Sequence, residues 1–65
     1  MEYRILGSLS LRNALSHLPE RERMVIDLRY FHGLTQQKIA GLLGVSQVQV
    51  SRIEKKALTN LRTYL

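Results

Sequence analysis

Residues 36–53 read QQKIAGLLGVSQVQVSRI and contain the small and branched apolar residues of two packed helices joined by a turn. A helix-turn-helix needs a short helix, a tight turn at a small flexible residue, and a second helix packed steeply against the first. Ala40 is small enough for two helices to approach closely, and Gly44 tolerates the left-handed backbone of the turn. Five branched apolar residues complete the motif: Ile39, Leu43, Val45, Val50 and Ile53. The stretch therefore predicts a helix-turn-helix.

Apolar spacing predicts two further helices before this unit. Four residues recur at the i, i+3, i+4 and i+7 positions of one helix face: Leu11, Ala14, Leu15 and Leu18. Ser8 or Ser10 can cap the start of that helix. Pro19 ends it and opens a second helix to about Phe31, after which Gly33 can adopt the positive φ of a helix end.

The two helices of the unit carry their own start signals. Thr35 is a good N-cap for the third helix, and Ser46 caps the fourth with Gln49 completing a capping box. The apolar residues expected to pack inward are Val25 and Leu28, flanked by Met24, Ile26 and Phe31, and then Ile39, Ala40, Leu42 and Leu43. We expect an all-α, compact four-helix domain at residues 8–65, with the helix-turn-helix in its third and fourth helices, after a flexible segment at residues 1–7.

Size and charge narrow the classes of function. A 65-residue chain forms one small domain, which buries only about 60% of the surface that its unfolded form exposes. Ten lysines and arginines against five acids give a formal net charge of +5, which favours polyanionic partners such as nucleic acid. The basic excess lies in the C-terminal third, where Glu54 is the lone acid after Ser46. Without cysteine, a membrane-length apolar run or a signal-peptide pattern, the chain is expected to be soluble.

The fourth helix presents the side chains that point to DNA. The positions left over from the apolar pattern should face outward: Gln47, Val48, Gln49, Ser51, Arg52 and Lys55. Arg52 can donate two hydrogen bonds to a guanine, a glutamine can pair with an adenine, and Val48 can meet a thymine methyl group. The same apolar spacing also fits a helical hairpin inside a bundle, but the amide-rich face, the basic tail and the small Ala40 together favour DNA binding.

Residues 18–65 resemble region 4 of bacterial sigma factors of the sigma-70 class. One anchor is LPERER at residues 18–23 with LRY at residues 28–30. The other joins LT at residues 34–35 and GVS at residues 44–46 to VSRIEKKAL at residues 50–58 and LR at residues 61–62. The stretch at residues 46–56 is most similar to the alternative sigma factors of Gram-positive sporulation and general stress responses.

The resemblance implies a domain that reads the minus-35 promoter element and docks on the flap of the polymerase β subunit. Base contacts then fall on Gln47, Val48, Ser51 and Arg52, with Gln49 beside them on the outward face. Phosphate contacts fall at or near Arg21, Arg29, Gln36 and Lys55, and Thr35, Ser46 and Lys38 are further candidates. An anti-sigma factor or an activator is a further candidate partner, and a bacterial cytoplasmic location at the nucleoid is expected.

Two of the candidate phosphate contacts, Lys38 and Arg21, need separate comment. Lys38 departs from the family, which usually has an acidic residue there that would complete a capping box with Thr35; we expect Lys38 to gain a phosphate contact instead. Arg21, together with Arg23, can instead pair with Asp27 or with neighbouring glutamates on a solvated helix face.

Other classes of function have less support. An enzyme is disfavoured because His17 and His32 are the only histidines, Asp27 is the sole aspartate, and no metal-ligand cluster or phosphate loop occurs. Each histidine is expected to be a surface residue near a helix end, and neither a cofactor nor a metal is expected. A free-standing regulator, whose output domain would bind DNA as a dimer, is the main alternative. In a third reading protein binding dominates, through an apolar groove between the first two helices.

Overall fold

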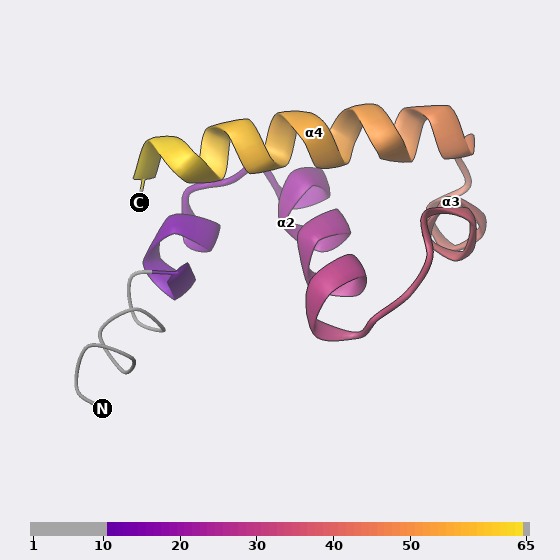
Figure 1. The fold of residues 1–65 in the computed structure, drawn as a ribbon, viewed down its shortest axis with the longest axis horizontal. Coiled ribbons are helices and arrows are strands. Elements are labelled where there is room, and N and C mark those ends of the chain that lie inside the picture. Colours follow the sequence, from indigo (N-terminus) through magenta and orange to yellow (C-terminus); the bar gives the residue numbers. More distant parts are fainter. Residues whose placement is uncertain (1–10, 65) are drawn as a thin grey trace.

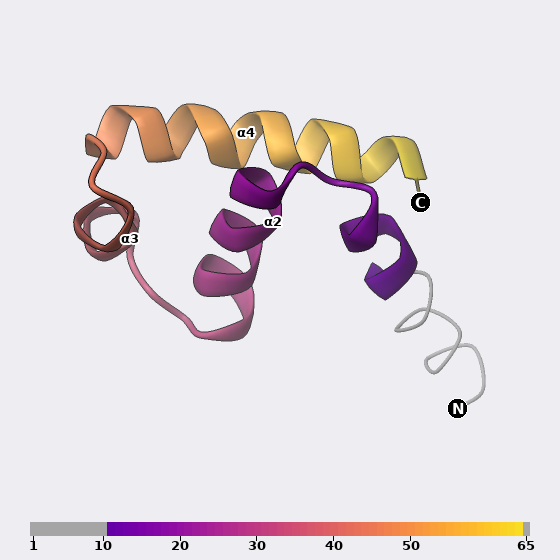
Figure 2. The ribbon, with the colours of Figure 1, turned by 180° about the vertical axis from the view of Figure 1, so that it is seen from behind.

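The computed structural model describes residues 11–64, and all of its regular elements are helices. Residues 11–16 are helical, and α2 (Glu20–Ile26) continues directly into the π-helix η1 (Asp27–Phe31). The short α3 (Gln36–Leu43) and the long α4 (Gln47–Tyr64) follow. The other helices lie on one side of α4, with α3 at its N-terminal end and residues 11–16 near its C-terminal end (Figures 1 and 2). The predicted all-α architecture is confirmed.

The second helix covers the predicted range, but its geometry changes near its end. Pro19 lies just outside α2 as the N-cap, and its carbonyl accepts the N–H of Arg23 at 2.9 Å. From Asp27 onward the helix widens, and the N–H of His32 donates to the carbonyl of Asp27, five residues back, at 3.1 Å. Gly33 then ends the element at a φ of 70°, as predicted. Ser8, Ser10 and the segment at residues 1–7 lie outside the described residues.

Local caps fix both helices of the helix-turn-helix. Thr35 Oγ1 accepts the N–H of Lys38 at 3.1 Å, which starts α3. Gly44 takes the left-handed conformation at a φ of 71° and makes the turn. The capping box of α4 forms in both directions: Ser46 Oγ accepts the N–H of Gln49 at 3.1 Å, and Gln49 Oε1 accepts the N–H of Ser46 at 3.4 Å. The predicted caps and turn are confirmed.

Two apolar clusters hold the helices together. The first contains Ala14, Leu18, Ile26, Ala57 and Leu61, and joins the N-terminal helix to α2 and to the C-terminal half of α4. The second contains Val25, Ile39, Ala40 and Val50, and joins α2 and α3 to the N-terminal half of α4. Because α2 lies between the two clusters, its neighbouring residues Val25 and Ile26 are both buried.

The structure corrects five of the expected core positions, one of which is Met24, a residue that is 39% exposed. Ile26 is a core residue rather than a flanking one, and Leu28 is only half-buried against the second cluster. Phe31 is 56% exposed and Leu42 is 63% exposed. Leu42 points to solvent because it lies about 100° around the helix from Leu43, on the side away from α2 and α4. The π-helical turn leaves Phe31 on the surface.

Candidate nucleic-acid interface

The N-terminal half of α4 presents one continuous polar surface. The inward side of α4 is set by Val50, Glu54, Ala57 and Leu61, which are all buried. The six residues expected to face outward are all exposed: Gln47, Val48, Gln49, Ser51, Arg52 and Lys55. Val48 is 61% exposed, an apolar side chain among amides, a hydroxyl and cations. This surface, which we call the reading face, can donate to base edges, accept from them and contact a methyl group.

The two capping residues lie at the starts of α3 and α4, and the hydroxyl oxygen of each already accepts a hydrogen bond. Thr35 and Ser46 each accept a backbone N–H, from Lys38 and Gln49 respectively. A hydroxyl that accepts one hydrogen bond keeps its own O–H as a donor. Both residues are exposed, so each O–H is available to a phosphate oxygen.

Three of the expected phosphate-contacting cations are exposed: Arg21 on α2, Lys38 on α3 and Lys55 on α4. Within residues 11–64 none of them forms an ion pair, and the alternative pairing of Arg21 or Arg23 with Asp27 or a nearby glutamate does not occur. Asp27 lies instead 3.4 Å from Nε2 of His32. The charges of these cations therefore face solvent.

Arg29 and Gln36, by contrast, are half-buried, and their polar groups contact other groups of the protein. Gln36 Nε2 donates to Oε1 of Glu54 at 2.8 Å. Nε of Arg29 lies 3.6 Å from the same oxygen, and Nη1 of Arg29 donates to the carbonyl of Leu34 at 3.1 Å. Nε of Arg29 is fully buried and forms no hydrogen bond in the structure. Both side chains therefore contact Glu54, whereas the exposed cations form no ion pair within the described residues.

Glu54 is the centre of this arrangement, and sequence reasoning missed its role. It is 8% exposed, and its Oε2 accepts the hydroxyl of Tyr30 at 2.6 Å. Burial raises the pKa of Glu54, but the hydrogen bonds from Tyr30 and Gln36 and the charge of Arg29 outweigh burial and lower it. The bond to Glu54, aided by burial and the carboxylate charge, raises the pKa of Tyr30 against the opposing charge of Arg29.

The sequence did carry a signal for Glu54. Val50, Glu54, Ala57 and Leu61 recur at the spacing of one helix face, so a single acid falls on the buried side of a basic helix. A second buried acid, Glu22, had a similar signal, because Val25 and Ile26 follow it at the i+3 and i+4 spacing of one helix face. Glu22 accepts a hydrogen bond from Asn60 Nδ2 at 2.9 Å across the α2–α4 junction, and this pairing depends on the tertiary arrangement.

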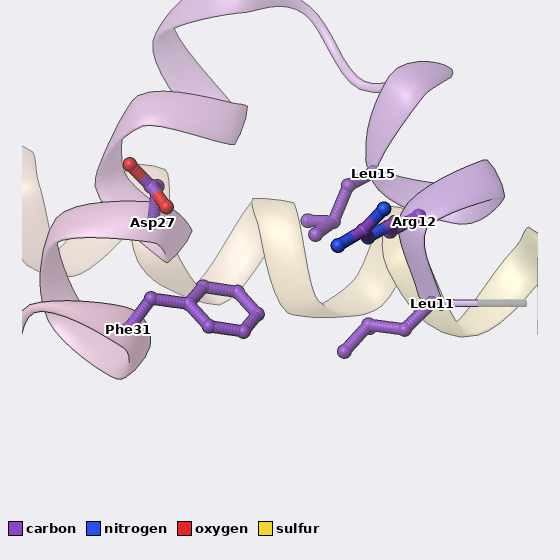
Figure 3. A pocket seen from close by; sticks show the side chains of 5 residues that line it. All are labelled: Leu11, Arg12, Leu15, Asp27 and Phe31. Atoms are coloured by element: carbon purple, nitrogen blue, oxygen red, sulfur yellow. The ribbon is translucent and has the colours of Figure 1, made fainter. Parts of the chain in front are cut away.

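A second surface lies at the other end of the molecule, between residues 11–16 and the end of the second helix. A cavity of about 410 Å³ opens there, and Leu11, Leu15 and Phe31 provide its apolar lining. In Figure 3 these side chains point into the space between the two helices, and Arg12 and Asp27 come from opposite walls. We call this surface the apolar groove. The sequence predicted a groove in this position.

The histidines occupy surface positions near helix ends. His17 follows the first helix, and its ring stacks on Tyr64 with a centroid separation of 4.7 Å. His32 follows η1 and lies near Asp27. Among the residues that the structure describes, no group of three or more histidines and acids is arranged to hold a metal ion. Of the helices in this part of the chain, none has the length and apolar character of a membrane span.

Together, the tight turn at Gly44, the two caps and the exposed reading face define a helix-turn-helix domain of the DNA-binding class. Residues 14–63 match the family described as Sigma-70, region 4, and the chain belongs to that family. The resemblance inferred from the sequence is confirmed.

The chain is similar to part of several longer curated proteins. It is 42% identical over 60 residues to the RNA polymerase sigma-G factor of Clostridium acetobutylicum, which covers 92% of this chain and 23% of that protein. It is 42% identical over 64 residues to the RNA polymerase sigma-F factor of Bacillus subtilis, covering 98% of this chain and 25% of that protein. The RNA polymerase sigma factor SigF of Mycobacterium tuberculosis is 51% identical over 55 residues, covering 85% of this chain and 21% of that protein. The chain spans about a quarter of the length of the curated relatives it matches.

Proposed function

We propose that this chain is the promoter-reading domain of a sigma factor and binds the minus-35 element in the major groove with the reading face of α4. The observation that carries the proposal is the exposed polar surface at the start of α4, held on a helix-turn-helix frame in a chain of the sigma-70 region 4 family. The relatives are named as RNA polymerase sigma factors, which supports a role in directing RNA polymerase to promoters. A function in sporulation or stress response is part of the same proposal.

The base contacts in this proposal come from five exposed residues: Gln47, Val48, Gln49, Ser51 and Arg52. Arg52 suits the two acceptors of a guanine, and the glutamines suit the donor and acceptor of an adenine. Val48 suits a thymine methyl group because its side chain is apolar and exposed.

The phosphate contacts come from groups that the protein leaves available. Arg21, Lys38 and Lys55 are exposed cations, and the O–H groups of Thr35 and Ser46 lie at the starts of α3 and α4. So small a domain contacts few phosphates. Its own dissociation constant for DNA should therefore lie near the nonspecific range of ~10⁻⁴ to 10⁻⁶ M. Attachment to polymerase would then raise its effective concentration at the promoter.

The apolar groove is the proposed docking site for the polymerase core, through the flap of its β subunit. The groove lies toward the C-terminal end of α4, whereas the reading face lies at the N-terminal end, so the two surfaces can be occupied together (Figure 1). An anti-sigma factor or an activator is a further proposed partner. The proposal includes no catalytic role, and it places the protein in the bacterial cytoplasm at the nucleoid.

Selection of bound sequences from random DNA duplexes tests the proposal. The 65-residue chain is incubated with the duplexes at low salt, and the bound fraction is sequenced. We expect one asymmetric site, as a single module of a sigma factor requires. An enriched palindrome would favour a free-standing dimeric regulator, and the absence of any enriched site would contradict promoter reading. Footprinting of the selected site with and without polymerase core tests the polymerase role in the same material.

A further inference from the structure

Glu54 joins η1 to the two helices of the helix-turn-helix, α3 and α4, at one buried carboxylate. Its Oε2 accepts from Tyr30 in η1 at 2.6 Å, and its Oε1 accepts from Gln36 in α3 at 2.8 Å. The charge of Arg29 in η1 stands 3.6 Å from Oε1. Glu54 itself belongs to α4, the helix that carries the reading face. One side chain thereby fixes α4 to both elements that precede it.

The geometry is specific because every contact depends on the angle and register of α4. Apolar contacts such as those of Val50 and Ile39 are non-directional, so they tolerate small rotations of the helix. Hydrogen bonds weaken steeply when their angles deviate, and those to an ionised acceptor are about twice as strong as neutral ones. Ser51 and Arg52 lie within one turn of Glu54, so a rotation of α4 at Glu54 displaces the reading face directly.

The same contacts hold the side chains of Arg29 and Gln36, two residues expected near phosphates, against the protein. The guanidinium of Arg29 lies beside the Glu54 carboxylate and donates to the carbonyl of Leu34, and its side chain is 38% exposed. Moving it onto a phosphate would leave a buried carboxylate without its counter-charge, which is strongly unfavourable. The amide of Gln36 is held by the same oxygen.

We propose that Glu54 is a positioning residue: it sets the orientation of the reading face and keeps Arg29 and Gln36 off the phosphates. This role rests on the proposed DNA-binding function. Arg29 and Gln36 then act through Glu54, whereas Arg21, Lys38 and Lys55 contact the backbone themselves. The family resemblance had placed Arg29 and Gln36, like Arg21 and Lys55, at or near phosphates, and the contact of Lys38 was a separate hypothesis.

The salt dependence of DNA binding tests the role of Arg29. One lost phosphate contact lowers the slope of log K against log salt by about 0.9. We expect Arg29→Ala to keep the wild-type slope, measured on the folded protein, and Lys55→Ala to lower it by about 0.9. A drop of about 0.9 in Arg29→Ala would overturn the assignment, because it would show Arg29 on a phosphate.

The ratio of affinities for the selected and a scrambled duplex tests the role of Glu54. We expect Glu54→Gln to lower this ratio about tenfold, the equivalent of ~1.4 kcal/mol, because a neutral amide holds its partners less firmly. Glu20→Gln is the matched control: it removes the same charge from an exposed position on α2 and should leave the ratio unchanged. A folded Glu54→Gln protein with the ratio of Glu20→Gln would overturn the proposal.

If Glu54→Gln does not fold, Tyr30→Phe tests the positioning role of Glu54 instead. Tyr30 is largely exposed, so the variant keeps the ring and removes only the hydroxyl that donates to Glu54. We expect a loss of about threefold to tenfold in the ratio, and an unchanged ratio would contradict the proposal. The wild-type protein distinguishes a failure of the proposed DNA-binding function from a failure of the positioning role. If the wild-type protein shows no preference for the selected duplex, the proposed function is wrong. If the wild-type protein and all the variants show the same preference, only the positioning role is wrong.

Discussion

At the scale of single residues, the reading face combines side chains of different chemical character. Arg52 and Lys55 are both exposed cations on α4, but we expect them to bind different parts of DNA. A guanidinium in the major groove distinguishes guanine from the other bases, whereas an ammonium on a phosphate carries no sequence information. Substitution should therefore separate specificity from affinity.

Arg52→Ala should weaken binding to the selected duplex by about 1 to 3 kcal/mol and relax the preference at one base pair. Lys55→Ala should weaken binding to selected and scrambled duplexes alike. Titration of both variants with both duplexes at one salt concentration measures the difference. Equal losses on the two duplexes for Arg52→Ala would show that Arg52 does not read a base.

Lys38→Glu should change stability and DNA affinity in opposite directions. The N–H of Lys38 already donates to Thr35 Oγ1, so a glutamate side chain there can complete the capping box and stabilise the protein by about 0.5 to 1 kcal/mol. The loss of the cation should lower the slope of log K against log salt by about 0.9.

Thermal unfolding and salt titration measure the two effects of Lys38→Glu. Arg62→Glu, in the last turn of α4, makes the same change of charge at the far end of the helix from the reading face and should keep the wild-type slope. An unchanged slope in Lys38→Glu would remove Lys38 from the phosphate contacts.

At the scale of elements, local signals were readable from the sequence and tertiary ones were not. Thr35, Ser46 and Gly44 act on their own turn of chain, and all three took the predicted roles. Ile26 is buried because helices lie on both sides of α2, which no periodicity within that helix reveals. Glu54 likewise depends on partners distant in the chain, although its place on the inward side of α4 was a readable sign. The polar reading face could be predicted because the apolar residues of α4 fix its inward side, and the remaining residues must then face solvent.

Gly41→Ala should stabilise the protein by about 1 kcal/mol. Gly41 lies inside α3 with helical geometry, and an added Cβ meets nothing within 4 Å, so alanine removes the backbone entropy cost of glycine without a clash. Gly44→Ala is the contrasting variant, because its φ of 71° disfavours any side chain by about 1 to 2 kcal/mol. Chemical denaturation of both variants gives the comparison, and a destabilised Gly41→Ala would show that the glycine meets a constraint outside the helix.

At the scale of the whole molecule, residues 11–16, which form one wall of the apolar groove, lie near the C-terminal end of α4 (Figure 2), whereas the reading face belongs to its N-terminal half. Leu11 and Leu15 of the apolar groove pack against the first apolar cluster, whereas Val50, in the N-terminal half of α4, belongs to the second. A change in the apolar groove should therefore leave the reading face in place.

Phe31→Asp should weaken binding to polymerase core about tenfold or more, because burial of a phenylalanine side chain contributes about 1.5 to 3 kcal/mol. The fold should tolerate the change, since Phe31 is already largely exposed. Leu42→Asp is the matched control, an equally exposed apolar residue on α3 outside the groove. Retention of the variants on immobilised core polymerase checks the prediction, and equal losses in the two would place the contact elsewhere.

Mapping of the backbone amide shifts of the isotope-labelled chain, as the selected duplex is added, tests whether the start of α4 reads DNA. We expect the largest changes on residues 46–52 and at the start of α3. Largest changes at Leu11, Leu15 and Phe31, with the start of α4 unmoved, would contradict this expectation.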